Sequence, residues 1–119
     1  MFADASDISD VYSFVSTDEI FTALSSPVRR RILQILLDRP QSVSSLVDQF
    51  DLQRPAVSEH LQVLRNAKLV RDVRQGRERF YHAEPQRLVE VNDWLRPFER
   101  YWRERMKLLN KVLDEESHD

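Results

Sequence analysis

Apolar residues recur at intervals of three and four along most of this chain, and that spacing restricts its fold more than any other feature. It places the apolar side chains on one face of each successive helix. The chain is therefore expected to be mainly helical. The predicted helices cover Thr17 to about Ser25, Pro27 to the residues before Pro40, a short stretch between Gln41 and Phe50, and about Arg54 to Asn66.

Capping residues set the predicted ends of these helices. Thr17 offers an N-cap for the first, and Ser26 offers one for the second, with Pro27 at its first position. Ser44 is expected to cap the third helix. Asn66 is expected to end the fourth in a left-handed conformation.

The only glycine, Gly76, lies between two runs that read as strands, 69–74 and 78–82. A tight hairpin needs a positive φ at its turn, and glycine adopts one without strain. Two helices joined by a tight turn and followed by such a hairpin are typical of the winged helix-turn-helix. The predicted fold class is thus α+β, mainly α, with a two-stranded β-hairpin wing and terminal dimerisation helices.

A long apolar stripe follows the wing, with helical spacing from Pro85 to about Leu113. Pro97 falls inside it and predicts a kink, or a break and restart, near residues 93–97. The predicted organisation is a loose N-terminal arm over 1–16, a winged helix-turn-helix domain over 17–84, one or more dimerisation helices over 85–113, and a polar tail over 114–119.

Charge is distributed unevenly along the chain. Residues 29–82 contain eleven Lys and Arg against six Asp and Glu, whereas both ends are acidic. This distribution is expected if only the centre meets phosphate, although an ordinary solvated surface remains an alternative. No apolar run approaches the roughly 20 residues of a membrane span, and the acidic start lacks the features of a signal peptide. A cytoplasmic location is expected.

Four ordered motifs are similar to those of the ArsR/SmtB repressors. They are ALSSPVRRRIL at 23–33, VSEHLQVL at 57–64, KLV at 68–70 and RQGRERFY at 74–81. Residues 94–95 and 98–109 resemble, more loosely, the end of a branch that does not sense metals. The resemblance implies a homodimer that pairs through its first and last helices and represses transcription by occupying operators.

The same resemblance places the helix over 54–66 in the major groove of DNA. Arg54 can read guanine and Glu59 can accept from cytosine, but both depart from the family pattern, so the operator cannot be carried over. His60 matches a family position, yet a contact within the domain is an equal alternative. The candidate DNA-binding residues are Gln53, Arg54, Ser58, Glu59, His60, Gln62 and Arg65 on or beside the helix, and Arg74, Arg77 and Arg79 on the wing.

The aromatic C-terminal stripe exceeds what so small a core can cover, which also favours a dimer. The alternative is that the stripe caps the wing of its own chain. The candidate dimerisation residues are Phe21, Leu24, Leu95, Phe98, Tyr101, Trp102, Met106 and Leu109.

No metal or other cofactor is expected. The family's thiolate sensors carry cysteines on the helix after Pro40, and this chain has no cysteine. The family's other metal site uses histidines on the last helix, but the three histidines are His60, His82 and His118. Relief of repression would then depend on an unidentified inducer or protein partner.

Two other classes of function compete with a DNA-binding repressor. An enzyme is not expected, because the chain has no cysteine nucleophile, no phosphate-binding glycine loop and no Ser/His/acid set in a motif context. The remaining rival is a winged-helix protein-interaction module that does not bind DNA and leaves its arginines in solvent.

Overall fold

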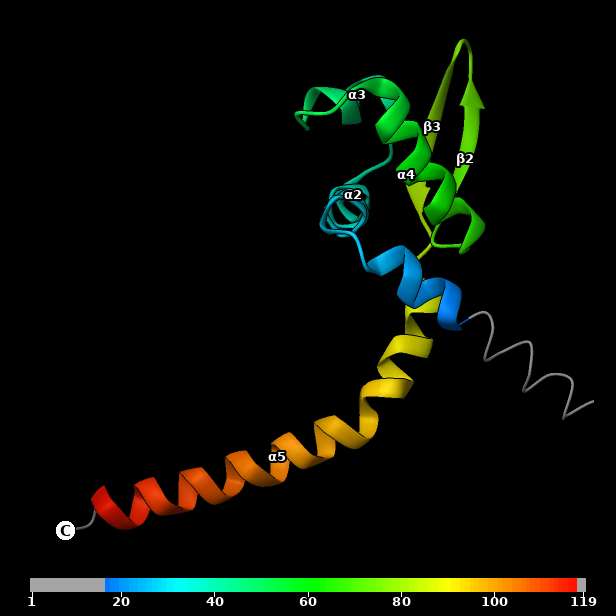
Figure 1. Ribbon diagram of the computed structural model, residues 1–119. Coiled ribbons are helices and arrows are strands. Elements are labelled where there is room, and N and C mark those ends of the chain that lie inside the picture. Colours follow the sequence, from blue (N-terminus) through cyan, green and yellow to red (C-terminus); the bar gives the residue numbers. More distant parts are fainter. Residues whose placement is uncertain (1–16, 118–119) are drawn as a thin grey trace, which may run out of the picture.

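The computed structural model describes residues 17–117 (Figure 1), so the arm expected over 1–16 lies outside the described residues. A helix covers residues 17–24. It is followed by α2 (Pro27–Asp38), β1 (Gln41–Ser42), α3 (Val43–Asp48), α4 (Arg54–Asn66), β2 (Val70–Gln75), β3 (Glu78–Ala83), the 3-10 helix η1 (Pro85–Leu88) and α5 (Val89–Ser117). This order confirms the mainly helical winged helix-turn-helix.

The helix starts are partly as predicted. Ser26 caps α2, because its hydroxyl accepts from the backbone N–H of Arg29 at 3.3 Å. Ser42, not Ser44, caps α3, with a distance of 3.1 Å from its Oγ to the backbone N of Ser45. Pairing with β3 holds Ser42 in the extended conformation that an N-cap requires. Thr17 is already helical, so it is not an N-cap.

The end of α4 also differs from the prediction. Lys68, not Asn66, has the positive φ, at 63°. The backbone N–H of Leu69 donates to the carbonyl of Leu64, and that of Lys68 donates to the carbonyl of Arg65, both at 3.0 Å. These two bonds form a Schellman motif, which satisfies the last carbonyls of the helix. A lysine therefore occupies a position where glycine or asparagine is more usual.

The sheet has three antiparallel strands in the order β1-β3-β2. β2 and β3 form the predicted hairpin, and Gly76 has the expected positive φ, at 64°. The two-residue β1 was not predicted; it pairs Gln41 with Tyr81 and Ser42 with Phe80. This pairing joins the wing to the start of α3, so the wing and the helix pair are built as one unit.

The core lies between α2, α3, α4 and the helix over 17–24. Val57, Leu61 and Leu64 are fully buried and form the inner face of α4. Ile20, Ile32 and Leu46 are also fully buried and come from the other three helices. Between the buried residues of α4, Ser58, Glu59 and Gln62 are exposed, whereas His60 and Val63 are half-buried.

The long helix α5 runs without interruption through Pro97 to Ser117, so of the two predicted alternatives, a kink or a break, the break is wrong, and the helix extends beyond Leu113. Pro97 cannot donate to the carbonyl of Asp93, and Figure 1 shows that α5 changes direction within its yellow stretch. No residue of α5 is buried, and the helix leaves the domain on the side away from the wing. The stripe therefore does not cap the wing of its own chain.

The base of α5 is held by polar contacts. Arg87 donates to the carbonyl of Ala67 at 2.6 Å and to the carboxylate of Glu90 at 3.1 Å. The hydroxyl of Thr17 donates to Glu90 at 2.9 Å. These bonds fix the start of α5 to the end of α4 and to the first helix. Among residues 17–117, none of the helices combines the length and apolar character needed to cross a bilayer.

Candidate nucleic-acid interface

The outer face of α4 carries the side chains predicted to read DNA. Gln53, Arg54, Ser58, Glu59 and Gln62 are all exposed. They alternate with the buried Val57, Leu61 and Leu64 at helical spacing. Gln62 donates to Asn66 at 2.9 Å, and both of these side chains are exposed.

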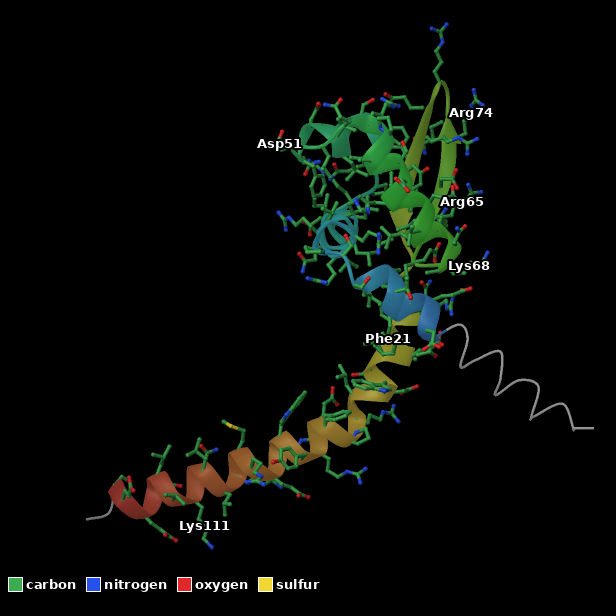
Figure 2. The ribbon with its side chains drawn as sticks, viewed as in Figure 1. Phe21, Asp51, Arg65, Lys68, Arg74 and Lys111 are labelled. Carbon is green, nitrogen blue, oxygen red and sulfur yellow. The ribbon has the colours of Figure 1, made fainter. Side chains whose placement is uncertain are left out.

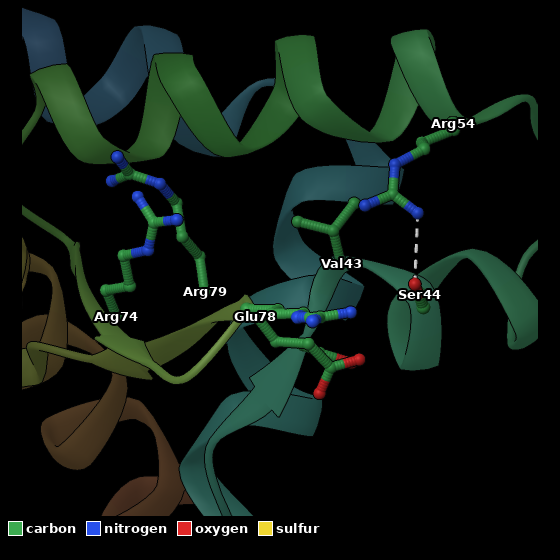
Figure 3. Close-up of a pocket in the computed structure, with 8 residues that line it drawn as sticks. Val43, Ser44, Arg54, Arg74, Glu78 and Arg79 are labelled. Atoms are coloured by element: carbon green, nitrogen blue, oxygen red, sulfur yellow. Dashed lines mark hydrogen bonds between the residues drawn. The ribbon is translucent and has the colours of Figure 1, made fainter.

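Arg54 begins α4 and also contacts α3. Its Nη1 donates to the hydroxyl of Ser44 at 3.0 Å (Figure 3). Pro55 follows at the second helical position, where its missing N–H costs no helical hydrogen bond. Arg54 is thereby held at the N-terminal end of α4, facing the space between the helix pair and the wing.

A cleft of about 330 Å³ separates the helix pair from the wing. Figure 3 shows the guanidinium groups of Arg74 and Arg79 close together beneath α4, with Arg54 at the other end of the cleft. Four arginines against one glutamate make the cleft strongly positive, which suits an anion such as phosphate. The lining residues are Ser42, Val43, Ser44, Arg54, Arg74, Arg77, Glu78 and Arg79.

The wing arginines differ in how they are held. Arg74 and Arg77 are exposed and form no ion pair within the described part of the chain, although Arg74 donates to the carbonyl of Gly76 at 3.4 Å. Arg79 forms an ion pair with Asp72. Arg65, from the last turn of α4, also binds Asp72, with Nε 3.2 Å from Oδ1. The structure thus ties two of the predicted DNA-binding arginines to one carboxylate.

Tyr81 lies opposite Asp72 in the hairpin. Burial of its phenol raises the pKa of Tyr81, and the negative charge of Asp72 raises the pKa further. The arginines that neutralise Asp72, Arg65 and Arg79, act in the opposite direction. The hydroxyl therefore stays protonated to a higher pH than in an exposed tyrosine.

His60 is half-buried and its Nδ1 lies 3.2 Å from Nη1 of Arg29. Arg29 also donates to the carbonyl of Ala23 at 2.7 Å and to that of Thr22 at 3.0 Å. This contact favours the alternative in which the histidine is used within the domain. Sequence reasoning assigned no such role to Arg29 or Asp72, although an acid in a basic hairpin was a usable signal for Asp72.

The candidate dimerisation residues fall into two groups. Leu24 packs against the core and Leu95 is half-buried, whereas the others on α5 are exposed. Figure 2 places Phe21 where the helix over 17–24 meets α5. From there a row of rings continues along α5, with centroid distances of 5.5 Å from Phe21 to Trp94, 4.9 Å from Trp94 to Phe98 and 6.4 Å from Phe98 to Trp102.

Comparison with known proteins agrees with this geometry. The family described as bacterial regulatory protein, arsR family, matches residues 26–72, which run from the cap of α2 into β2. The HTH-type transcriptional regulator Rv2034 of Mycobacterium tuberculosis is 33% identical over 107 residues, covering 90% of this chain and 97% of that protein. The transcriptional repressor SdpR of Bacillus subtilis is 28% identical over 81 residues, covering 68% of this chain and 90% of that protein.

Solved structures lead to the same family. The ArsR-like transcriptional regulator from Rhodococcus sp. RHA1 superposes with a TM-score of 0.69 at 30% identity, covering 87% of this chain and 95% of that one. The match extends beyond the helix-turn-helix into the terminal helices, since it covers most of both chains. This chain therefore belongs to the ArsR family of transcriptional regulators, which are DNA-binding proteins and not enzymes.

Proposed function

We propose that this regulator represses transcription as a homodimer that occupies a pseudo-palindromic operator. The observation that carries the proposal is the cleft between α4 and the wing, where four arginines face one glutamate beside an exposed polar helix face. A recognition helix beside a positive wing suits one turn of a DNA duplex, with base edges on one side and phosphates on the other. A cytoplasmic location goes with this role.

The proposed contacts to bases come from the outer face of α4. Arg54 would read guanine through O6 and N7, and Glu59 would accept from cytosine N4. Arg74 and Arg77 on the wing would bind phosphate or the minor groove. His60 is half-buried against Arg29, and Arg65 and Arg79 are ion-paired with Asp72. The proposed contact set is therefore Gln53, Arg54, Ser58, Glu59, Gln62, Arg74 and Arg77.

The proposed dimer interface is the exposed aromatic row of α5 together with Phe21. Trp94, Tyr101, Trp102 and Met106 are each 51–54% exposed, so about half of each side chain contacts solvent in a single chain. Such a row is more apolar than a monomer surface usually is, and a second copy of α5 would cover it. Two reading helices would then meet half-sites about 10 base pairs apart.

The proposal includes no metal. The sequence has no cysteine, so the thiolate sites of the family lack their ligands, and the side chain of His60 is bound to Arg29. The signal that releases the repressor would be a small molecule or protein still to be identified.

A comparison of two arginine variants tests the proposal. Operator fragments are first selected from the source genome, and binding to operator and to scrambled duplex is then measured over a salt series. Arg54→Ala is expected to weaken the operator about tenfold or more and the scrambled duplex much less. Arg77→Ala is expected to weaken both equally and to make the slope of log K against log salt shallower by about 0.9 for each phosphate that the variant no longer neutralises.

The matched control is Arg103→Ala, which removes the same charge from α5, far from the cleft. It should leave both affinities unchanged. If Arg74 and Arg77 of both subunits each bind one phosphate, the wild-type slope should be about −3.6. A protein that binds no duplex in dilute buffer would instead support the protein-interaction module, and equal losses from both variants on both duplexes would refute the division of roles.

A further inference from the structure

Asp72 lies at the only place in the described chain where one carboxylate joins the recognition helix to both strands of the wing. It is in β2, and its side chain is only 7% exposed. Arg65 reaches it from the last turn of α4, and Arg79 reaches it from β3. The three elements whose relative position decides how the wing meets DNA thus share one buried charge.

The hairpin register explains how these groups meet. Side chains two residues apart on a strand share a face, so Asp72 and Arg74 point the same way on β2, as do Arg79 and Tyr81 on β3. Arg74 lies directly opposite Arg79, and Asp72 lies diagonally from it. Like charges placed opposite each other repel. Asp72 offsets that repulsion by taking up the positive charge of Arg79.

The pairing also determines which arginines remain for phosphate. The side chains of Arg65 and Arg79 are 50% and 55% exposed, so they lie close enough to solvent to reach an anion if released. A carboxylate as buried as that of Asp72 requires charged partners, because leaving it unpaired is strongly unfavourable. In the folded protein these two arginines are therefore held on Asp72, while Arg77 forms no ion pair with any of residues 17–117.

We propose that Asp72 is a positioning residue that determines specificity: it holds Arg65 and Arg79 on the protein, where they fix the angle of the wing against α4 instead of binding phosphate. This inference rests on the proposed function, in which the cleft binds DNA. A fixed wing restricts binding to duplexes whose shape fits it. Withholding two positive charges at each half-site also limits the binding that is independent of sequence.

Asp72→Asn tests this directly, because asparagine keeps the shape of the side chain and removes its charge. The released arginines are expected to bind phosphate, so that scrambled duplex binds more tightly. The slope of log K against log salt should become steeper by up to about 1.8 per subunit, the effect of two phosphates. The ratio of operator to scrambled affinity should fall about tenfold, comparable with the removal of one base-reading side chain.

Glu84→Gln is the matched control. It makes the same change in net charge and breaks another ion pair at the base of the wing, where Nε of Arg71 lies 2.5 Å from the carboxylate of Glu84. Arg71 precedes Asp72 on β2 and so points to the opposite face of the sheet. The salt slope and the affinity ratio of Glu84→Gln should therefore match those of the wild type.

Two further variants test the proposal from the side of the arginines. Arg65→Gln and Arg79→Gln each leave Asp72 with one partner. If Asp72 keeps both arginines from phosphate, neither variant should change the salt slope, whereas both should lower the affinity ratio because the wing is less firmly held. A purely structural role would lower stability without changing the ratio, so circular dichroism at the assay temperature accompanies each measurement.

The outcomes separate this inference from the function on which it rests. Wild-type protein that binds no duplex would overturn the proposed function. Wild-type binding with an unchanged slope in Asp72→Asn would overturn only the inference. A slope shallower by about 0.9 in Arg65→Gln or Arg79→Gln would also overturn it, since that arginine would then bind phosphate in the wild type. The two arginine variants decide the matter even if Asp72→Asn does not fold.

Discussion

Arg29→Met is expected to destabilise the domain markedly, although the sequence alone gives Arg29 no structural role. Its guanidinium bonds the carbonyls of Ala23 and Thr22 at the end of the first helix and lies against His60 of α4. Both carbonyls belong to the last turn of the helix over 17–24, where the helix itself supplies few donors. The carbonyl of Thr22 also accepts from the backbone N–H of Ser25 at 3.1 Å and from its hydroxyl at 2.6 Å, so the bond to Ala23 matters most. One side chain thus completes the end of one helix and joins it to another.

The size of the effect follows from the three contacts. A hydrogen bond from a charged donor contributes about 1.5–3 kcal/mol when buried, and less when solvent competes. The bond to Ala23 is short and half-buried, whereas the bond to Thr22 is exposed and the contact with His60 is longer. If the bond to Ala23 contributes the lower of these values and the other two contacts each contribute a fraction of it, the loss in free energy of unfolding is about 2.5 kcal/mol. For a domain of this size that corresponds to a fall in Tm of about 10 °C.

Urea unfolding followed by far-ultraviolet circular dichroism measures this effect. All variants are compared at one protein concentration, because any dimer association adds to the apparent stability. Arg29→Lys should lose most of the same free energy, since a single ammonium cannot span three acceptors that a planar guanidinium reaches together. Arg30→Met is the matched control: Arg30 makes one exposed bond, to the carbonyl of Leu24, and its removal should cost less than about 1 kcal/mol.

Two results would refute this reasoning. If Arg29→Met unfolds at the same urea concentration as Arg30→Met, the two contacts that Arg29 makes beyond the single one of Arg30 contribute nothing measurable to stability. If Arg29→Lys is as stable as the wild type, the positive charge matters and the forked geometry does not. In the first case the end of the first helix must be stabilised by packing alone, through the buried Ile20 and Ala23.

Two further predictions concern the dimer and the pH dependence. Trp102→Ala should weaken self-association about 30-fold or more, as for an aromatic residue central to an interface, and should lower DNA affinity as a consequence. Sedimentation measures the self-association, with Arg103→Ala as the neighbouring control. An unchanged dimer would show that Trp102 is not in the interface. Because the pKa of Tyr81 is raised in the folded state, its contribution to stability is complete below pH 10.0 and should be lost as pH rises through the folded value. The urea midpoint of unfolding should therefore fall at alkaline pH, and Tyr81→Phe should remove the part of that fall that Tyr81 causes. If the fall is the same in Tyr81→Phe as in the wild type, other groups cause it.

Local chemistry was enough to predict most of the helices. Ser26 and Pro27 mark the start of α2 by their own side chains, and the spacing of Val57, Leu61 and Leu64 gives the buried face of α4. Both signals act within one or two helical turns, so they can be read without knowing the fold. The outer face of α4, and with it the candidate reading residues, follows from the same periodicity.

One error occurs where a distant contact decides the local structure. Ser42 caps α3 because β1 pairs with β3, nearly forty residues later in the chain, and nothing beside Ser42 or Ser44 announces that pairing. Lys68 takes the left-handed position because two backbone bonds close around it, although Asn66 has the more suitable side chain. At Pro97 the sequence left a kink and a break as alternatives, and α5 bends without ending, because an exposed helix can leave one carbonyl to solvent.

The charge pattern shows most clearly what the sequence alone leaves undecided. The excess of basic residues over 29–82 indicates a surface for phosphate, but a count of charges does not show which arginines are available to bind it. In the folded chain Arg29 serves the first helix, Arg71 pairs with Glu84, and Arg65 and Arg79 share Asp72. What remains beside α4 is a smaller set, Arg54, Arg74 and Arg77, around one cleft. A carboxylate such as Asp72 subtracts little from the net charge of the chain, yet by its position it decides which arginines are left to meet DNA.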